Sequence, residues 1–166
     1  YYYHEDLISY NNLYSYGLPF QVTSYAFKKS EYVQGEGWVS NRIGYNQGVP
    51  NRVESFNTRA FYNGAGLKAT LDFRIGGLSK NSLVGDDHLL EVGVGSSSSS
   101  FTSLFDTTFD GYTSFGKKID VSMAELGSIN TYVNVAGKYI ALTGAHSFGI
   151  GYMKLTFPRQ YDLLDG

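Results

Sequence analysis

The feature that most constrains the fold is a run of alternating side chains near the end of the sequence, over Gly149–Arg159. Met153, Leu155 and Phe157 fall on one face of an extended chain, with mostly polar residues between them. This pattern predicts a strand with one buried face. Because proline cannot donate a backbone hydrogen bond to a neighbouring strand, Pro158 is expected to end the strand at Phe157 and turn the chain away.

The same two-residue period recurs upstream and predicts further strands. The alternation is complete over residues 68–75. Further alternating segments lie at residues 89–94, 101–108, 117–121 and 129–135. Weaker extended segments are expected at 18–27, around Trp38, at 53–61 and at 139–143. Glycine- and asparagine-rich turns separate most of these segments.

One short helical turn is predicted near residue 122. Ser122 followed three residues later by Glu125 is a capping box. In this motif, each of the two side chains accepts a hydrogen bond from the backbone N–H of the other residue. Gly127 is then expected to close the turn in the left-handed conformation.

These elements predict an all-β fold, in agreement with 20 glycines, 15 tyrosines and 11 phenylalanines among 166 residues. Each strand has one apolar face, so two packed antiparallel sheets are expected; a single open sheet would leave that face in water. A jelly roll is the preferred sandwich, and an immunoglobulin-like sandwich is the alternative. We expect a single domain over residues 1–166, with residues 1–17 as an N-terminal arm or an edge strand.

Charge and composition exclude several function classes. A net charge of −2 and a pI near 5.9 give no basic surface for nucleic acid. The sequence has no apolar run long enough to span a membrane. Without cysteine it has no disulfide, thiolate metal site or cysteine nucleophile. Because it begins at Tyr1 without a methionine, the simplest interpretation is a mature fragment cut from a longer protein.

Two runs place metal-ligand residue types side by side, His4-Glu5-Asp6 and Asp86-Asp87-His88. Adjacent residues of an extended chain point to opposite faces, so solvated loop polarity is favoured over a metal site at both. No cofactor is predicted; the alternative is calcium, for which Asp87, Asp106 and Asp110 together offer a loop. Turn capping by aspartate is the favoured interpretation, so no metal ligand is predicted.

No catalytic residue is predicted. Ser147 follows His146 and Asp120 is available elsewhere, but no nucleophile motif accompanies them, and adjacent Ser and His residues are usually coincidental. Pairs of glutamates for glycoside hydrolysis can be found in any chain of this size.

Aromatic residues offer the better candidate site. Jelly rolls often recognise carbohydrate by stacking aromatic rings on sugars, and the candidate ligand-binding residues are Trp38, Asn41, Arg42 and Tyr45. A lone tryptophan in a domain of this size is usually buried, so the competing interpretation places Trp38 in the core.

Three short motifs carry a family resemblance: the tyrosine-rich start with His4-Glu5, Gly35-Glu36 beside Trp38, and the last strand closing on Phe157-Pro158-Arg159. In this arrangement the chain resembles the region ahead of the catalytic domain in gingipain-type cysteine peptidases. Within that family it is most similar to the PorU-type sortases of type IX secretion and their relatives.

The resemblance implies a secreted or cell-surface bacterial protein that uses type IX secretion. Peptidases of this family cut peptides with a Cys and a His, and this chain has no Cys. The resemblance therefore implies that the chain is a non-catalytic accessory domain, whose partner is a downstream peptidase domain of the same polypeptide. The alternative is a carbohydrate-binding module of a secreted glycan-active protein. An independent hydrolase is a distant third.

Overall fold

A computed structural model describes residues 1–16, 36–44, 48–80, 85–138 and 146–161, and this part of the chain is nearly all β structure. The segments expected at 18–27 and 139–143 lie outside the described residues. The strands are β1 (Tyr2–Ser9), β2 (Leu13–Tyr16), β3 (Glu36–Val39), β4 (Asn51–Asn57), β5 (Ala69–Gly77), β6 (His88–Ser97), β7 (Ser100–Phe109), β8 (Ser114–Val121), β9 (Asn130–Gly137) and β10 (Phe148–Arg159). One 3₁₀ turn, η3 (Met123–Glu125), interrupts them. Within these ranges, no helix has the length and apolar character needed to cross a bilayer.

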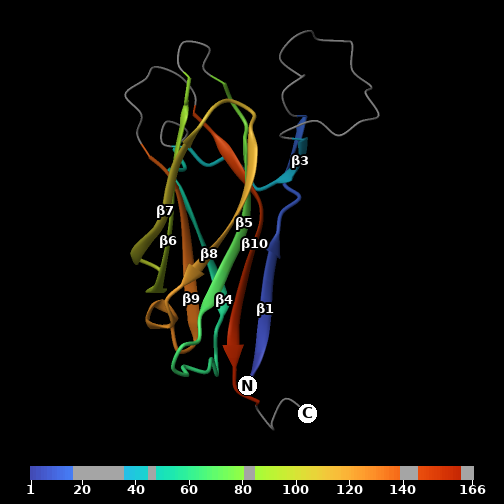
Figure 1. Ribbon diagram of the computed structural model, residues 1–166. Helices are drawn as coiled ribbons and strands as arrows, with labels where there is room; N and C mark the ends of the chain where they lie inside the picture. The colour runs from blue at the N-terminus through green and yellow to red at the C-terminus, as the bar shows by residue number, and fades with distance from the viewer. Residues whose placement is uncertain (17–35, 45–47, 81–84, 139–145, 162–166) are drawn as a thin grey trace.

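Eight of these strands form two four-stranded antiparallel sheets, in the orders β1-β10-β5-β8 and β4-β9-β6-β7. Figure 1 shows the two sheets as facing layers, with β3 beside the upper part of β1 and β10. The pairs β1 with β10, β4 with β9 and β5 with β8 are nested around the β6–β7 hairpin. This nesting, with the chain passing between the sheets, is a jelly roll, which confirms the predicted sandwich. The small β2–β3 sheet is an addition that the sequence did not predict.

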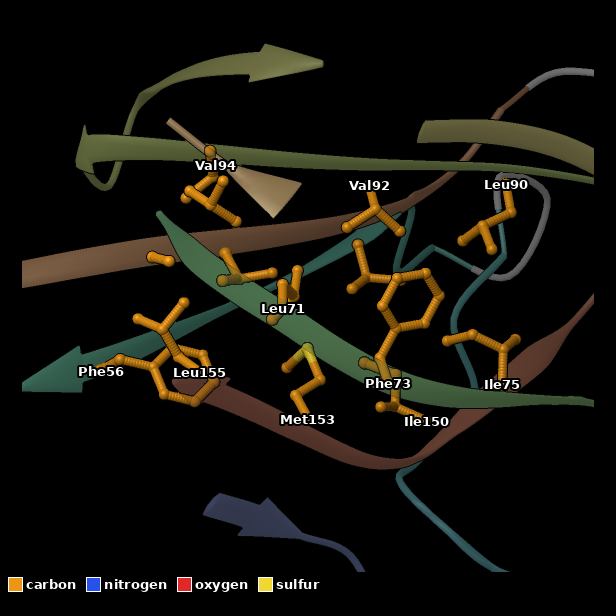
Figure 2. Close-up of a cluster of buried hydrophobic side chains, with 14 of the residues drawn as sticks. Phe56, Leu71, Phe73, Ile75, Leu90, Val92, Val94, Ile150, Met153 and Leu155 are labelled. Atoms are coloured by element: carbon orange, nitrogen blue, oxygen red, sulfur yellow. The ribbon is translucent and has the colours of Figure 1, made fainter. Parts of the chain in front are cut away.

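The core lies between the two large sheets. Figure 2 shows side chains from β5 and β10 facing those from β4 and β6. The alternation predicted for residues 68–75 is confirmed, since every second side chain of β5 from Ala69 to Ile75 is fully buried. On β10, Met153, Leu155 and Phe157 are fully buried as predicted. Each of these large side chains contributes about 1.5–3 kcal/mol of transfer free energy.

The predicted end of the last strand is wrong, because β10 continues through Pro158 to Arg159. The nitrogen and carbonyl of a strand residue point to the same side. The carbonyl of Pro158 accepts the backbone N–H of Tyr62 at 2.8 Å, so its nitrogen faces away from its β1 partner Tyr3. Pairing with β1 therefore requires no N–H from Pro158, and β5 has already ended on the other side.

The helical turn exists, but its predicted capping is only partly correct. Ser122 Oγ accepts a backbone N–H of η3 as expected. Glu125 does not complete the box, because its carboxylate instead accepts the hydroxyl of Thr102 on β7 at 2.9 Å. Leu126 already returns to extended backbone, so Gly127 does not adopt the left-handed conformation. A methyl group on Gly127 would instead strike the backbone carbonyl of Asn130, the first residue of β9.

The N-terminal segment forms β1, which is an edge strand of the described part of the chain, where it pairs only with β10. Its neighbour across the open side of the sandwich is β4, the edge of the other sheet. Asp6 Oδ2 accepts the backbone N–H of Asn57 at 3.1 Å, and the Arg52 guanidinium lies 4.9 Å from the centre of the Tyr10 ring. These polar contacts join the two edges, and an inward-pointing charge on an edge strand discourages pairing with other chains.

Candidate aromatic binding surface at the β2–β3 sheet

Trp38 is a surface residue, and the competing interpretation that placed it in the core is wrong. Its side chain is 56% exposed, whereas that of the next residue, Val39, is 6% exposed. The two-residue period of β3 turns Val39 inward against Gly149 of β10 and therefore turns Trp38 outward. An exposed tryptophan offers a large apolar face for stacking.

Tyr14 holds the Trp38 ring in place. The two residues are direct partners in the antiparallel β2–β3 pair, and their ring centroids lie 5.2 Å apart at an interplanar angle of 73°. This edge-to-face geometry contributes about 0.5–1.5 kcal/mol beyond area burial. Tyr14 could not be recognised from the sequence, because the pairing that brings it to Trp38 joins segments more than twenty residues apart.

The segment that follows Trp38 is fixed to the first residues of β10. Ser40 donates its backbone N–H to the carbonyl of Ile150 at 2.8 Å, and Ile43 and Phe148 exchange two backbone hydrogen bonds of 2.9 and 3.0 Å. The hydroxyl of Ser40 also accepts the N–H of Ile150 at 3.1 Å. Four hydrogen bonds thus attach this segment to a central strand of the fold.

Asn41 and Arg42 lie on this anchored segment and are both exposed. Asn41 and Arg42 thus follow Trp38 within four residues on an exposed stretch of the chain, while Tyr45 lies outside the described residues. We refer to Trp38, Tyr14, Asn41 and Arg42 together as the Trp38 surface. It combines an aromatic face with amide and guanidinium hydrogen-bond donors, which is the chemistry that recognises a sugar ring and its hydroxyls.

The run His4-Glu5-Asp6 does not converge on one point. His4 packs against Phe157 with ring centroids 5.3 Å apart, while Glu5 faces outward and accepts a hydrogen bond from Lys154 at 3.1 Å. Asp6 turns inward to β4, as described above. Within the ranges that the structure describes, no three His, Asp or Glu side chains lie close enough together to hold a metal ion.

The second run, Asp86-Asp87-His88, contributes to a buried polar cluster, so the predicted solvated loop polarity is wrong for Asp87 and His88, which are 0% and 1% exposed. Asp87 Oδ1 accepts the backbone N–H of Gly111 at 2.7 Å, so the predicted turn capping is confirmed for this aspartate. Its neighbour His88 is also buried, and the rings of His88 and His146 lie 6.4 Å apart. Ser147 is fully buried beside His146. We refer to Asp87, His88, His146 and Ser147 as the histidine cluster.

A serine triad built on Ser147, His146 and Asp120 is not present. Asp120 lies opposite Thr70 at one end of β5, whereas the backbone of Ser147 bonds the hydroxyl of Ser79 just beyond the other end. At about 3.3 Å per strand residue, these positions are roughly 25–30 Å apart. Asp120 is instead paired with Lys68.

An open cleft of about 510 Å³ lies between the β4–β5 loop and η3. Its lining consists of residues 63–68 and 120–124 and includes no aromatic side chain. The Trp38 surface is therefore the better candidate for stacking on a ring-shaped ligand.

No protein-family model and no curated protein sequence matches the chain. Among solved structures, the chain is similar to dimeric latent PorU from Porphyromonas gingivalis, with a TM-score of 0.60 and 12% identity over 97% of this chain. The chain spans 13% of the length of that PorU chain.

Two carbohydrate-binding modules are also structurally similar to the chain. One is the CBM36-1 domain of a multidomain xylanase from the hindgut metagenome of Trinervitermes trinervoides, with a TM-score of 0.43 and 13% identity over 92% of this chain and 96% of the module. The other comes from the family 9 glycoside hydrolase Cel9A of Ruminococcus flavefaciens FD-1, with a TM-score of 0.39 and 15% identity over 71% of this chain and 92% of the module. At these identities, the similarity to PorU establishes a shared β-sandwich fold.

Proposed function

We propose that this chain is a non-catalytic β-sandwich domain of a larger secreted protein and that it binds carbohydrate through the Trp38 surface. The observation that carries the proposal is the exposed ring of Trp38, which packs edge-to-face against Tyr14. The residues that follow Trp38 are hydrogen-bonded to β10. Exposed aromatic side chains on rigid elements bind with little loss of conformational entropy. The adjacent Asn41 and Arg42 supply donors for sugar hydroxyls.

Replacing Trp38 by alanine is expected to weaken glycan binding by about 1–2 kcal/mol, which is a roughly five- to thirty-fold rise in Kd. Titration calorimetry with soluble xylan, β-glucan and mannan oligosaccharides measures this change. Tyr62→Ala is the matched control, because Tyr62 is also exposed but lies at the far end of β10. Equal binding by the wild type and Trp38→Ala, or loss of binding only in Tyr62→Ala, would contradict the assignment of the site.

The second candidate function is a docking domain for a downstream peptidase domain of the same polypeptide, in a bacterial gingipain-like protein exported by type IX secretion. It is supported by the sequence resemblance and by the fold similarity to PorU over 97% of this chain. Deleting residues 1–166 from the parent protein should then reduce its peptide cleavage or its folding yield. Unchanged cleavage without these residues would argue against docking.

A further inference from the structure

Buried polar atoms without hydrogen-bond partners gather in the histidine cluster. Within the described ranges, no partner is found for His88 Nδ1, either ring nitrogen of His146, or Ser147 Oγ. Folded proteins pair nearly all buried polar atoms, and leaving one unpaired costs about 1–3 kcal/mol. The unpaired polar atoms of the histidine cluster therefore lower the stability of this part of the sandwich.

The contacts of His88 define which nitrogen carries its proton. Nε2 faces three oxygens, the carbonyls of Ser79 and Gly111 at 3.1 Å each and Oδ1 of Asp87 at 3.2 Å. Because all three oxygens are acceptors, Nε2 bears the hydrogen and Nδ1 keeps a lone pair. A second proton on Nδ1 would create a buried donor with no acceptor.

Other charged groups near His88 do not offset the cost of placing a second proton on its ring. Burial has the largest effect and lowers the pKa of His88 below its ordinary value. Asp87 and the carbonyls of Ser79 and Gly111 act in the opposite direction, and His146 lowers the pKa further. Lys80 and Asp110 neutralise each other in an ion pair of 3.4 Å beside the carbonyls that face Nε2. Asp86 is exposed and accepts the hydroxyl of Thr108.

The histidine cluster connects directly to the Trp38 surface through the first residues of β10. Only Ser147 separates His146 from Phe148, which exchanges two backbone hydrogen bonds with Ile43. Two residues later, Ile150 bonds Ser40 through both backbone and hydroxyl. Phe148 also packs edge-on against the His88 ring at 6.5 Å. Displacement of this part of β10 would therefore release the segment that carries Asn41 and Arg42.

We propose that protonation of His88 in mild acid loosens the start of β10 and thereby disorganises the Trp38 surface. This regulation rests on the proposed function of that surface, but the conformational change itself does not require a ligand. The charge would be solvated only when the strand end opens, so acid favours the open state.

The direction of the pH dependence follows from the lowered pKa of His88. The open chain takes up a proton near the ordinary histidine pKa of about 6.5, whereas the closed form resists it. The closed form is therefore fully favoured above this pH and loses free energy relative to the open form as the pH falls below it, until the folded pKa is reached.

The fluorescence of Trp38 tests the proposal, because it is the only tryptophan in the sequence. Emission is recorded between about pH 8 and pH 5, the range in which histidine titrates. Far-UV circular dichroism recorded in parallel separates local opening from global unfolding. We expect a fluorescence transition below about pH 6.5 while the β-sheet signal persists.

The chain has three histidines, and the third provides the matched control. His88→Gln should shift or abolish the transition, and His146→Gln should weaken it. His4→Gln should leave it unchanged, because His4 packs against Phe157 at the other end of β10. A flat wild-type profile, or the same transition in His88→Gln and His146→Gln, would overturn the proposal.

Amide hydrogen exchange on the wild type provides a test that needs no variant to fold. After correction for intrinsic exchange rates, protection of the Ser40 and Ile43 amides should fall several-fold in acid, while protection of β5 amides is retained. Uniform protection would refute the coupling. Absence of glycan binding at neutral pH would contradict the proposed function alone, since neither fluorescence nor exchange depends on a ligand.

Discussion

Replacing Phe73 by alanine is expected to lower the free energy of unfolding by about 3–5 kcal/mol. Phe73 is fully buried at the centre of β5, and Figure 2 shows its ring reaching from that strand toward the opposite sheet. Its removal forfeits the transfer free energy and leaves a cavity that the two sheets cannot close without disturbing β10 and β8. Urea denaturation, followed by circular dichroism, measures the loss.

Phe101→Ala is the control for the same chemical change. Phe101 lies on β7 in a half-buried position and does not belong to the hydrophobic core or to the side chains packed against it. Its truncation should cost less than about 1 kcal/mol, in the range of ordinary surface changes. Similar losses in the two variants would show that the core is not centred on β5.

Much of the fold could be predicted from alternation alone. The strands with a clean apolar face, β5, β6 and β10, lie where the pattern placed them, because a two-residue period has only one way to be half-buried. The nested strand order could not be predicted, because the same alternation fits both a jelly roll and an immunoglobulin-like sandwich. The end of β10 could not be predicted, because whether proline interrupts a strand depends on which side its nitrogen faces, and that side is set by β1 and Tyr62.

The Trp38 surface was only half predictable. Trp38 and Val39 are adjacent apolar residues in a glycine-rich stretch, so the sequence cannot say which of them faces inward. The answer depends on Gly149 of β10, which leaves space for Val39. The presence of Asn41 and Arg42 beside Trp38 follows from their neighbouring positions in the chain, whereas the partnership with Tyr14 depends on strand pairing.

The histidine cluster could not be assembled from the sequence, since its contacts join four separate segments around residues 79, 87, 111 and 146. The sequence marked Asp87-His88 and His146-Ser147 as separate runs. Their meeting depends on the turns at one end of the sandwich, where β5, β6 and β8 begin or end.

Gly77→Ala is expected to cost about 2–4 kcal/mol, because a methyl group there would collide with the backbone carbonyl oxygen of Gly111. That carbonyl cannot move freely, since it faces His88 Nε2, and the N–H of the same residue is bonded to Asp87. The new methyl carbon would also lie 3.2 Å from His88 Nε2. The substitution should therefore lower Tm and also alter the acid transition reported by Trp38.

Gly85→Ala separates this steric effect from the general effect of replacing glycine. Among the residues that the structure describes, no atom lies within 4 Å of the added carbon at Gly85, and its backbone does not require glycine. Its stability should change by less than about 0.5 kcal/mol, with a small gain from the stiffer unfolded chain. Equal Tm values for the two variants would mean that the Gly111 turn yields readily. A turn that yields readily could not hold the His88 ring in the buried position that lowers its pKa, so this one comparison tests both the packing at Gly77 and the rigidity that the acid response requires.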